Sequence, residues 1–146
     1  MDVLADTNLI LRRLHRAHPQ YRLARGAITH FSKNGNCVCV TSQNLIELWA
    51  VATRPVENNG YGLTPDQADR VIARVEASLF RLPDSDDVYG EWRRLVVQHR
   101  VSGKKTHDAR IVAAMNVCGV THILTFNRPD FSRYPEITVV DPGAAV

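Results

Sequence analysis

No apolar stretch of this sequence comes near the roughly 18 residues that a membrane-spanning helix needs. Apolar stretches such as residues 9–11 and 37–40 cover only a few positions. Asp2 and Asp6 stand where a secretory signal peptide would carry a basic head and an apolar run. We therefore expect a cytoplasmic protein with no membrane partner.

Cysteine is also scarce. The chain has 3 cysteines, an odd number, and none of them forms a CxxC pair, so a disulfide framework is not expected. Cys37 and Cys39 alternate along an expected buried strand, where cysteine behaves as a small apolar residue. His15 and His18 are spaced as HxxH, but no third ligand lies near them in sequence, so zinc is not predicted either.

The size and charge of the chain favour a small globular protein with an anionic partner. At 146 residues and 45% hydrophobic composition, the chain can form one domain, residues 1–146. A domain of this size buries roughly 68–70% of its unfolded surface. The net charge of +3 is modest, but the basic residues cluster at 12–16, 93–100 and 104–105. A phosphate backbone is the commonest partner of such clusters.

Short apolar segments alternate with helical patterns along the chain. We expect strands at 3–5, 37–40, 80–82, 122–126 and 138–140. We expect helices after caps at Thr7 or Asn8, Thr41 or Ser42, Thr64, Asp84 or Ser85, and Thr106, and a further one over 22–31. Residues 64–67 form a capping box with proline at the first helical position, and residues 55–63 are an expected loop. This alternation predicts an α/β fold, a doubly wound parallel sheet of four to five strands whose ligand cleft lies beyond the carboxyl ends of the strands.

Three acidic side chains are expected to converge at that edge. Asp6 ends the first strand, Glu47 lies in the second turn of a helix, and Asp108 lies in the first turn of another. Two unit charges about 4 Å apart repel by roughly 4 kcal/mol at an effective dielectric near 20, so such a group either protonates or holds a divalent cation. Each acid alone has a structural explanation, as a helix cap, an ordinary helical glutamate or a favourable charge at a helix N-terminus. Their joint occurrence favours a metal site.

Four motifs resemble those of PIN-domain ribonucleases, in particular VapC-type toxins of toxin–antitoxin pairs. They are Asp6-Thr7-Asn8, residues 44–48 around Glu47, residues 106–109 around Asp108, and residues 124–131. The resemblance covers nearly the whole chain in order. It implies a PIN-like fold, a ribonuclease in which Asp6, Glu47 and Asp108 hold Mg²⁺ or Mn²⁺, and a protein antitoxin as partner.

The chemistry of the residues agrees with this implication. Hard divalent cations prefer carboxylate oxygen, and a water activated by the metal can attack a phosphodiester without a protein nucleophile. The resemblance gives Thr7, Asn8 and Thr125 the task of orienting the carboxylates. Lys104, Lys105, Arg110 and Arg128 flank the acids, and we expect them as a group to hold RNA phosphates. His107 is interpreted as a surface histidine rather than a catalytic acid.

The fourth acidic position of the family is occupied by Asn127. Asn127 could ligate through its carbonyl or position the attacking water, and we count it with the catalytic residues. It adds no charge, so one tight metal site is expected. Asp130 follows three residues later, and a role at the site and a role as a loop cap both stay open for it.

Single residues argue against two other classes of protein. A dehalogenase-type phosphatase needs a second aspartate where this chain has Asn8, and a receiver domain needs an acid pair that is not evident. An RNA- or protein-binding PIN-like module with little or no catalysis is the main alternative. The apolar stripe of the helix over 64–79 is explained equally by a homodimer and by the core of the chain.

Overall fold

A parallel sheet of five strands forms the centre of the protein in the computed structural model, which describes residues 1–144. The strand order is β3-β2-β1-β4-β5, and every neighbouring pair is parallel. The doubly wound parallel sheet predicted from the sequence is therefore confirmed. Its strands are β1 (Val3–Ala5), β2 (Val38–Val40), β3 (Phe80–Arg81), β4 (His122–Leu124) and β5 (Thr138–Val140).

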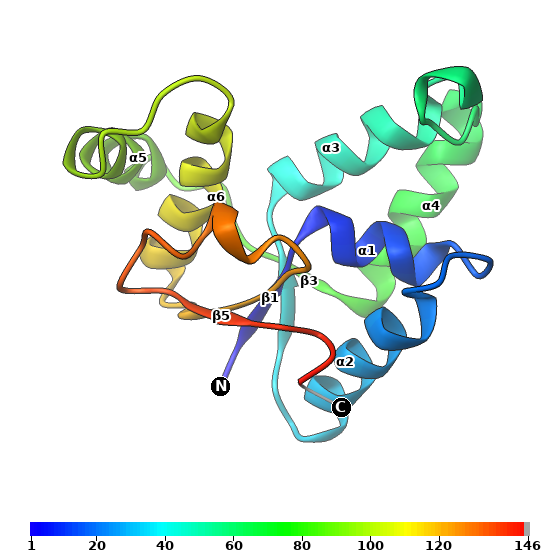
Figure 1. Cartoon of the computed structure of the whole chain (residues 1–146), viewed down its shortest axis with the longest axis horizontal. Helices are drawn as coiled ribbons and strands as arrows, with labels where there is room; N and C mark the ends of the chain where they lie inside the picture. Colours follow the sequence, from blue (N-terminus) through cyan, green and yellow to red (C-terminus); the bar gives the residue numbers. More distant parts are fainter. Residues whose placement is uncertain (145–146) are drawn as a thin grey trace.

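Helices cover both faces of this sheet (Figure 1). The helices α1 to α4 lie on one side, and α5 and α6 lie on the other. Within residues 1–144, no helix is both long and apolar enough to cross a bilayer. The helices are α1 (Thr7–Leu14), α2 (Tyr21–Lys33), α3 (Ser42–Thr53), α4 (Pro65–Ser78), α5 (Asp87–Gln98) and α6 (Lys105–Cys118), with short 3-10 turns at η1 (Val56–Asn58) and η2 (Arg128–Asp130).

The central strand β1 explains why the core has two halves. Val3 and Ala5 face the α1–α4 side, whereas Leu4 faces α5 and α6, because successive side chains of a strand point to opposite faces. All three residues are completely buried. The apolar stripe of α4 packs on the first half through Val75, so the core of the chain itself accounts for this stripe.

Several helix boundaries follow the capping signals of the sequence. Thr41 with Asn44, and Thr64 with Gln67, form complete capping boxes at the starts of α3 and α4. The helix α6 ends at Gly119, whose φ of +73° lies in the left-handed region that glycine adopts at little cost.

Other boundaries differ from the predictions. Asp6, not Thr7 or Asn8, caps α1, because its Oδ1 accepts the Thr7 N–H at 2.8 Å. The helix α6 begins at Lys105, so Thr106 lies inside the first turn instead of capping it. The helix α5 begins only at Asp87, although Ser85 Oγ accepts the Asp87 N–H at 3.2 Å.

The fourth strand is also shorter than predicted, since β4 ends at Leu124 and not at residue 126. Thr125, the next residue, still donates its N–H to the Val140 carbonyl at 3.3 Å and turns its hydroxyl toward Asp6.

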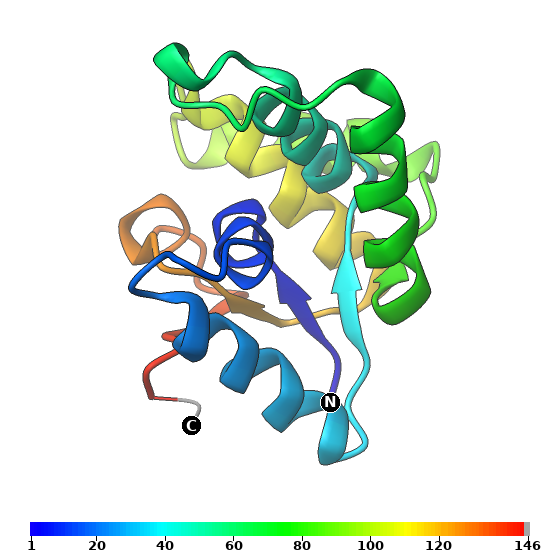
Figure 2. The same cartoon turned by 90° about the vertical axis from the view of Figure 1, so that its right-hand side faces the viewer.

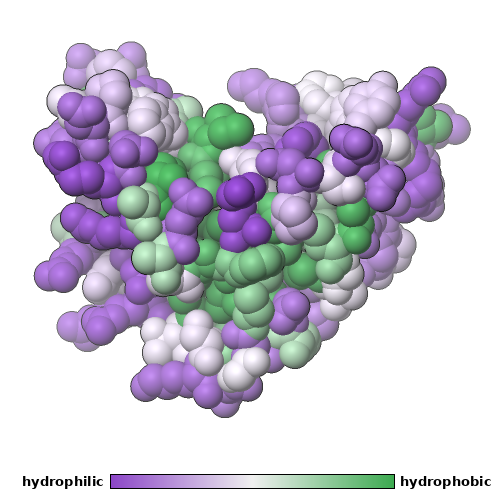
Figure 3. Space-filling view, turned by 180° about the vertical axis from the view of Figure 1, so that it is seen from behind, coloured by the Kyte–Doolittle hydropathy of each residue, from purple (hydrophilic) through white to green (hydrophobic). Residues whose placement is uncertain are grey.

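The carboxyl ends of the strands meet at one end of the molecule. Figure 2 shows the arrowheads of β1 and β2 pointing toward the starts of α1 and α3. The space-filling view in Figure 3 shows the surface hollowed at this end, between two lobes. The predicted acidic residues follow or flank these strand ends.

Candidate active site

Asp6 is held rigidly at the centre of the sheet edge. Its N–H donates to the Leu124 carbonyl at 3.0 Å, which extends the pairing of β1 with β4 by one residue. Its carboxylate is only 7% exposed and caps α1 through Oδ1. The other oxygen, Oδ2, accepts the Thr125 hydroxyl at 2.8 Å and the Asn8 amide at 3.1 Å. Both carboxylate oxygens are therefore oriented by neighbours.

Glu47 is brought to the same place by the first turns of α3. Its Oε2 accepts the Thr7 hydroxyl at 2.7 Å, and its Oε1 accepts the Gln43 amide at 3.0 Å. The completely buried Asn44 donates from Nδ2 to Thr7 Oγ1 at 3.0 Å, so the capping box of α3 also fixes Thr7. Consequently the start of α1 and the start of α3 share one hydrogen-bond network.

Asp108 approaches from the opposite half of the molecule, in the first turn of α6. Its pKa is raised to about 6, chiefly by burial and further by the charges of Asp130, Asp6 and Glu47, against a lowering effect of Lys105. Burial likewise raises the pKa of Asp6 to about 6; hydrogen bonds from Thr125 and Thr7 oppose this, and the charges of Glu47 and Asp130 add to it. Asp6 and Asp108 therefore both lie within electrostatic reach of Glu47 and of Asp130.

The structure associates Asp130 with the acids more closely than Asn127. Asp130 raises the pKa of both Asp6 and Asp108, and its Oδ1 lies 3.6 Å from Lys105 Nζ. Asn127 is exposed and contacts the network through its backbone, where its N–H donates to Thr125 Oγ1 at 3.0 Å. Both roles of Asp130, at the site and as a loop cap, stay predictions.

The basic residues divide into two groups. Lys105 contacts Asp130, and Arg110 Nη1 donates to Gln43 Oε1 at 3.4 Å, so both adjoin the acids. Lys104 and Arg128 are exposed at the starts of α6 and η2, and the structure brings neither into a contact with the carboxylates.

Gln43 is a site residue that was not singled out from the sequence. Its amide donates to Glu47 and, at 2.7 Å, to the His107 carbonyl, so it links α3 with the start of α6. Its spacing of four residues from Glu47 on one helix was the available signal, because residues four apart on a helix are neighbours. Nothing in the sequence around His107 indicates that its carbonyl accepts this hydrogen bond.

The donor set suits a hard cation that keeps much of its water. In the part of the chain that the structure describes, no three His, Cys, Asp or Glu side chains lie close enough to chelate one ion directly. Mg²⁺ is commonly bound through one or two carboxylates and several waters, so this spacing is compatible with a hydrated ion. The pKa values of Asp6 and Asp108 are raised chiefly by burial and further by neighbouring carboxylates, and a bound cation would oppose both effects.

The fold is shared with solved toxin–antitoxin structures. VapBC2 from Rickettsia felis, bound to a promoter DNA fragment, matches with a TM-score of 0.70 and 19% identity, over 97% of this chain and 98% of that chain. VapBC-1 from nontypeable Haemophilus influenzae matches with a TM-score of 0.68 and 18% identity, over 98% and 99% of the two chains. VapC20 of Mycobacterium tuberculosis, a sarcin-ricin loop cleaving toxin, matches with a TM-score of 0.64 and 15% identity, over 90% and 95%.

These matches confirm the PIN-like fold that the sequence motifs imply: the chain has the fold of VapC-type PIN domains. No family model matches the sequence, and the curated proteins compared with it give no match. At identities below 20% for these three structures, the likeness shows the fold alone. The function has to be argued from the residues of the site.

Proposed function

We propose that this protein is a divalent-metal-dependent ribonuclease and the toxin of a toxin–antitoxin pair. The observation that carries the proposal is the set of mutually repelling carboxylates of Asp6, Glu47 and Asp108. Among residues 1–144, no lysine or arginine forms an ion pair with any of these three. Asp6 is buried and Glu47 and Asp108 are half-buried, and such a group of acids without an ion pair favours binding of an external cation, Mg²⁺ or Mn²⁺.

The residues around the carboxylates would prepare them for that ion. When bound, it supplies a water of lowered pKa and neutralises charge at the scissile phosphate. Thr125 and Asn8 hold one oxygen of Asp6, while Thr7 and Gln43 hold the two oxygens of Glu47. No protein nucleophile is required.

We propose that Asp130 and Asn127 together take the role of the fourth acidic position of PIN domains. Asp130 contributes charge, and Asn127 offers a neutral amide at the rim that could orient a water or the RNA. Because Asn127 adds no charge, a second metal ion would bind weakly, so we propose one tight site.

RNA phosphates are proposed to lie along the basic side chains at the same rim. Lys105 and Arg110 adjoin the acids directly, and Lys104 and Arg128 extend the positive surface. Such contacts position a phosphate backbone without specifying sequence.

An antitoxin partner is supported by the compared structures, of which VapBC2 and VapBC-1 are toxin–antitoxin complexes. We propose that the antitoxin covers the hollow at the strand ends (Figure 3). A cytoplasmic location and a homodimer remain predictions; light scattering of the purified protein tests the latter.

The alternative is a PIN-like module that binds RNA or protein without cutting. It is favoured by the absence of a directly chelating trio within residues 1–144 and by the uncharged Asn127. Cleavage activity decides between the two.

The test incubates the wild type, Asp6→Asn and Asp69→Asn with tRNA and rRNA, with and without Mg²⁺ or Mn²⁺. Asp69 is an exposed acid on α4 and serves as the matched control. We expect discrete, metal-dependent cuts from the wild type and the control, and none from Asp6→Asn. Equal cutting by all three, or cutting in EDTA, would contradict the proposed chemistry.

A further inference from the structure

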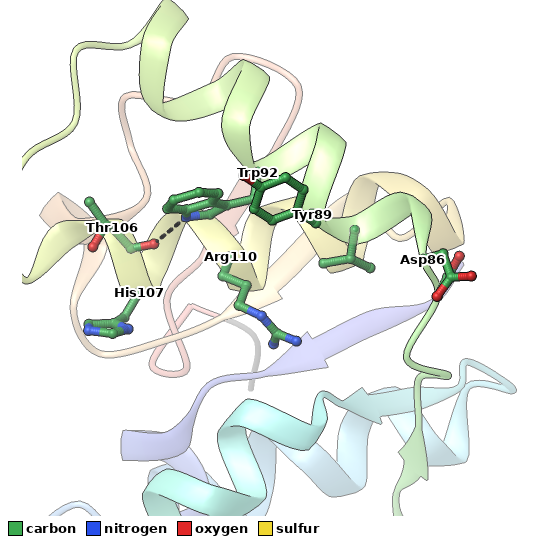
Figure 4. A pocket seen from close by; sticks show the side chains of 8 residues that line it. Asp86, Tyr89, Trp92, Thr106, His107 and Arg110 are labelled. Atoms are coloured by element: carbon green, nitrogen blue, oxygen red, sulfur yellow. Dashed lines mark hydrogen bonds between the residues drawn. The ribbon is translucent and has the colours of Figure 1, made fainter.

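A pocket of about 560 Å³ opens between α5 and the start of α6, the helix that carries Asp108. Figure 4 shows Tyr89 and Trp92 side by side on α5, with His107 and Arg110 projecting from α6 below them in this view. Asp86 marks the far end of the pocket. None of these residues belongs to the set proposed to hold the metal.

The two aromatic rings form a partly open platform. Their centroids are 5.9 Å apart and the ring planes are inclined by 35°, which is closer to stacked than to edge-on. Trp92 is fixed because its Nε1–H donates to the Thr106 carbonyl at 2.8 Å. Tyr89 is 66% exposed. An exposed tyrosine next to an anchored tryptophan offers an apolar surface to a flat ligand.

The opposite wall of the pocket carries positive charge. Arg110 forms no ion pair with any acid of the described chain, and its only recorded hydrogen bond there is the one to Gln43. Gln43 in turn holds Glu47, so contacts run continuously from the pocket to the carboxylates. Asp86 at the other end would repel an anion, which places a bound phosphate on the Arg110 side.

We infer that this pocket binds one unpaired nucleobase of the RNA substrate, stacked on Tyr89 and Trp92, with an adjoining phosphate at Arg110. This inference rests on the proposed ribonuclease function and narrows its substrate to RNA with a base that is free to leave its stack. Proteins commonly read single-stranded RNA by stacking splayed bases on aromatic rings and arginine planes. A base held in a regular duplex cannot enter such a pocket.

The main rival is a protein partner that buries the same rings, or a purely structural role for Trp92. A substitution of Trp92 cannot separate these explanations, because it would also remove the hydrogen bond that joins α5 to α6. Tyr89 can, since its side chain is largely outside the core. Val97 lies two turns further along α5, is 71% exposed and lies outside this pocket, so Val97→Ala is the matched control.

The experiment measures binding of fluorescein-labelled oligouridylate, oligoadenylate and their duplex by anisotropy. Ca²⁺ replaces Mg²⁺, so that a hard cation is present without cleavage. Loss of one stacking ring is worth roughly 1–3 kcal/mol, so Tyr89→Ala should weaken single-strand binding by about 5-fold to 150-fold. Tyr89→Phe and Val97→Ala should bind like the wild type, and duplex binding should be the same for all variants.

The outcomes separate this inference from the proposed function. If Tyr89→Ala binds single strands as tightly as the wild type, or if it weakens duplex binding equally, the inference is wrong even where the wild type cuts RNA. Absence of single-strand binding by the wild type also overturns it and leaves a protein partner as the occupant of the rings. If single-strand binding depends on the ring at residue 89 but the wild type does not cut tRNA or rRNA, base binding in this pocket is confirmed and the proposed ribonuclease function is refuted.

Discussion

Replacing Asp6 by asparagine should stabilise the metal-free protein at neutral pH while it abolishes activity. Asp6 is 7% exposed and its pKa is raised from 3.8 to about 6, chiefly by burial. A difference of about two pKa units corresponds to roughly 3 kcal/mol of destabilisation when the group is ionised. Asparagine keeps the Oδ1 acceptor for the Thr7 N–H but loses the carboxylate oxygen that accepts both the Thr125 hydroxyl and the Asn8 amide, at a cost of about 1–2 kcal/mol.

The expected net gain for Asp6→Asn is therefore about 1–2 kcal/mol, or about 2–8 °C in Tm. The gain depends on pH. Because the folded state holds the proton more tightly than the unfolded state, the wild type is stabilised below about pH 4 and loses that stability as the pH rises through about 6. The advantage of Asp6→Asn should therefore appear near pH 8 and disappear near pH 4.

Thermal unfolding in EDTA at both pH values measures this effect, with Asp69→Asn as the exposed control on α4. Mg²⁺ should then raise the Tm of the wild type more than that of Asp6→Asn, since a ligand stabilises the state that it binds. If Asp6→Asn is less stable than the wild type near pH 8, or if its gain in stability is independent of pH, the ionised Asp6 carboxylate does not destabilise the folded protein and the reasoning is wrong.

Three further perturbations test the remaining parts of the site. Thr125→Val removes the hydroxyl that donates to Asp6 and accepts from the Asn127 N–H. Because this hydroxyl orients the Asp6 carboxylate, Mg²⁺ affinity should fall about 10-fold to 100-fold in a calorimetric titration. An unchanged affinity would show that the hydroxyl does not contribute to metal binding. The value of kcat/KM should rise with pH through about 6, because protons compete with the metal at Asp6 and Asp108, whose pKa values are both raised to about 6; a flat profile would argue against these ligands. Asn127→Asp adds a further carboxylate and should strengthen the binding of a second Mn²⁺ several-fold, whereas unchanged stoichiometry in an isothermal titration would place residue 127 outside the metal site.

Local patterns account for the parts of the fold that were predicted correctly. The capping boxes at Thr41 and Thr64 join residues three apart, and Gly119 ends α6 through its own backbone conformation. The short apolar strands required helices on both faces of a parallel sheet. Where no side chain caps the helix, as at Lys104, the predicted start was displaced by one or two residues.

Contacts between distant segments could not be predicted in the same way. The hydrogen bond from Gln43 to the His107 carbonyl joins residues 64 positions apart, and the bond from Trp92 to Thr106 depends on how α5 packs against α6. The strand ends indicated which acids would share one edge of the sheet. Their orientation and the aromatic pocket depend on tertiary packing that no spacing in the sequence encodes.

The position of Asp6 shows how one residue can serve the fold and the proposed chemistry together. As a helix cap, its carboxylate would be satisfied by the Thr7 N–H alone, and a serine or asparagine would do equally well. The additional hydrogen bonds from Asn8 and Thr125, the burial, and the nearby charges of Glu47 and Asp130 are not needed for capping, and the burial and the charges oppose ionisation. A carboxylate that is oriented this fully and yet forms no ion pair with a lysine or arginine of residues 1–144 is better explained by the proposed divalent cation than by the stability of the helix.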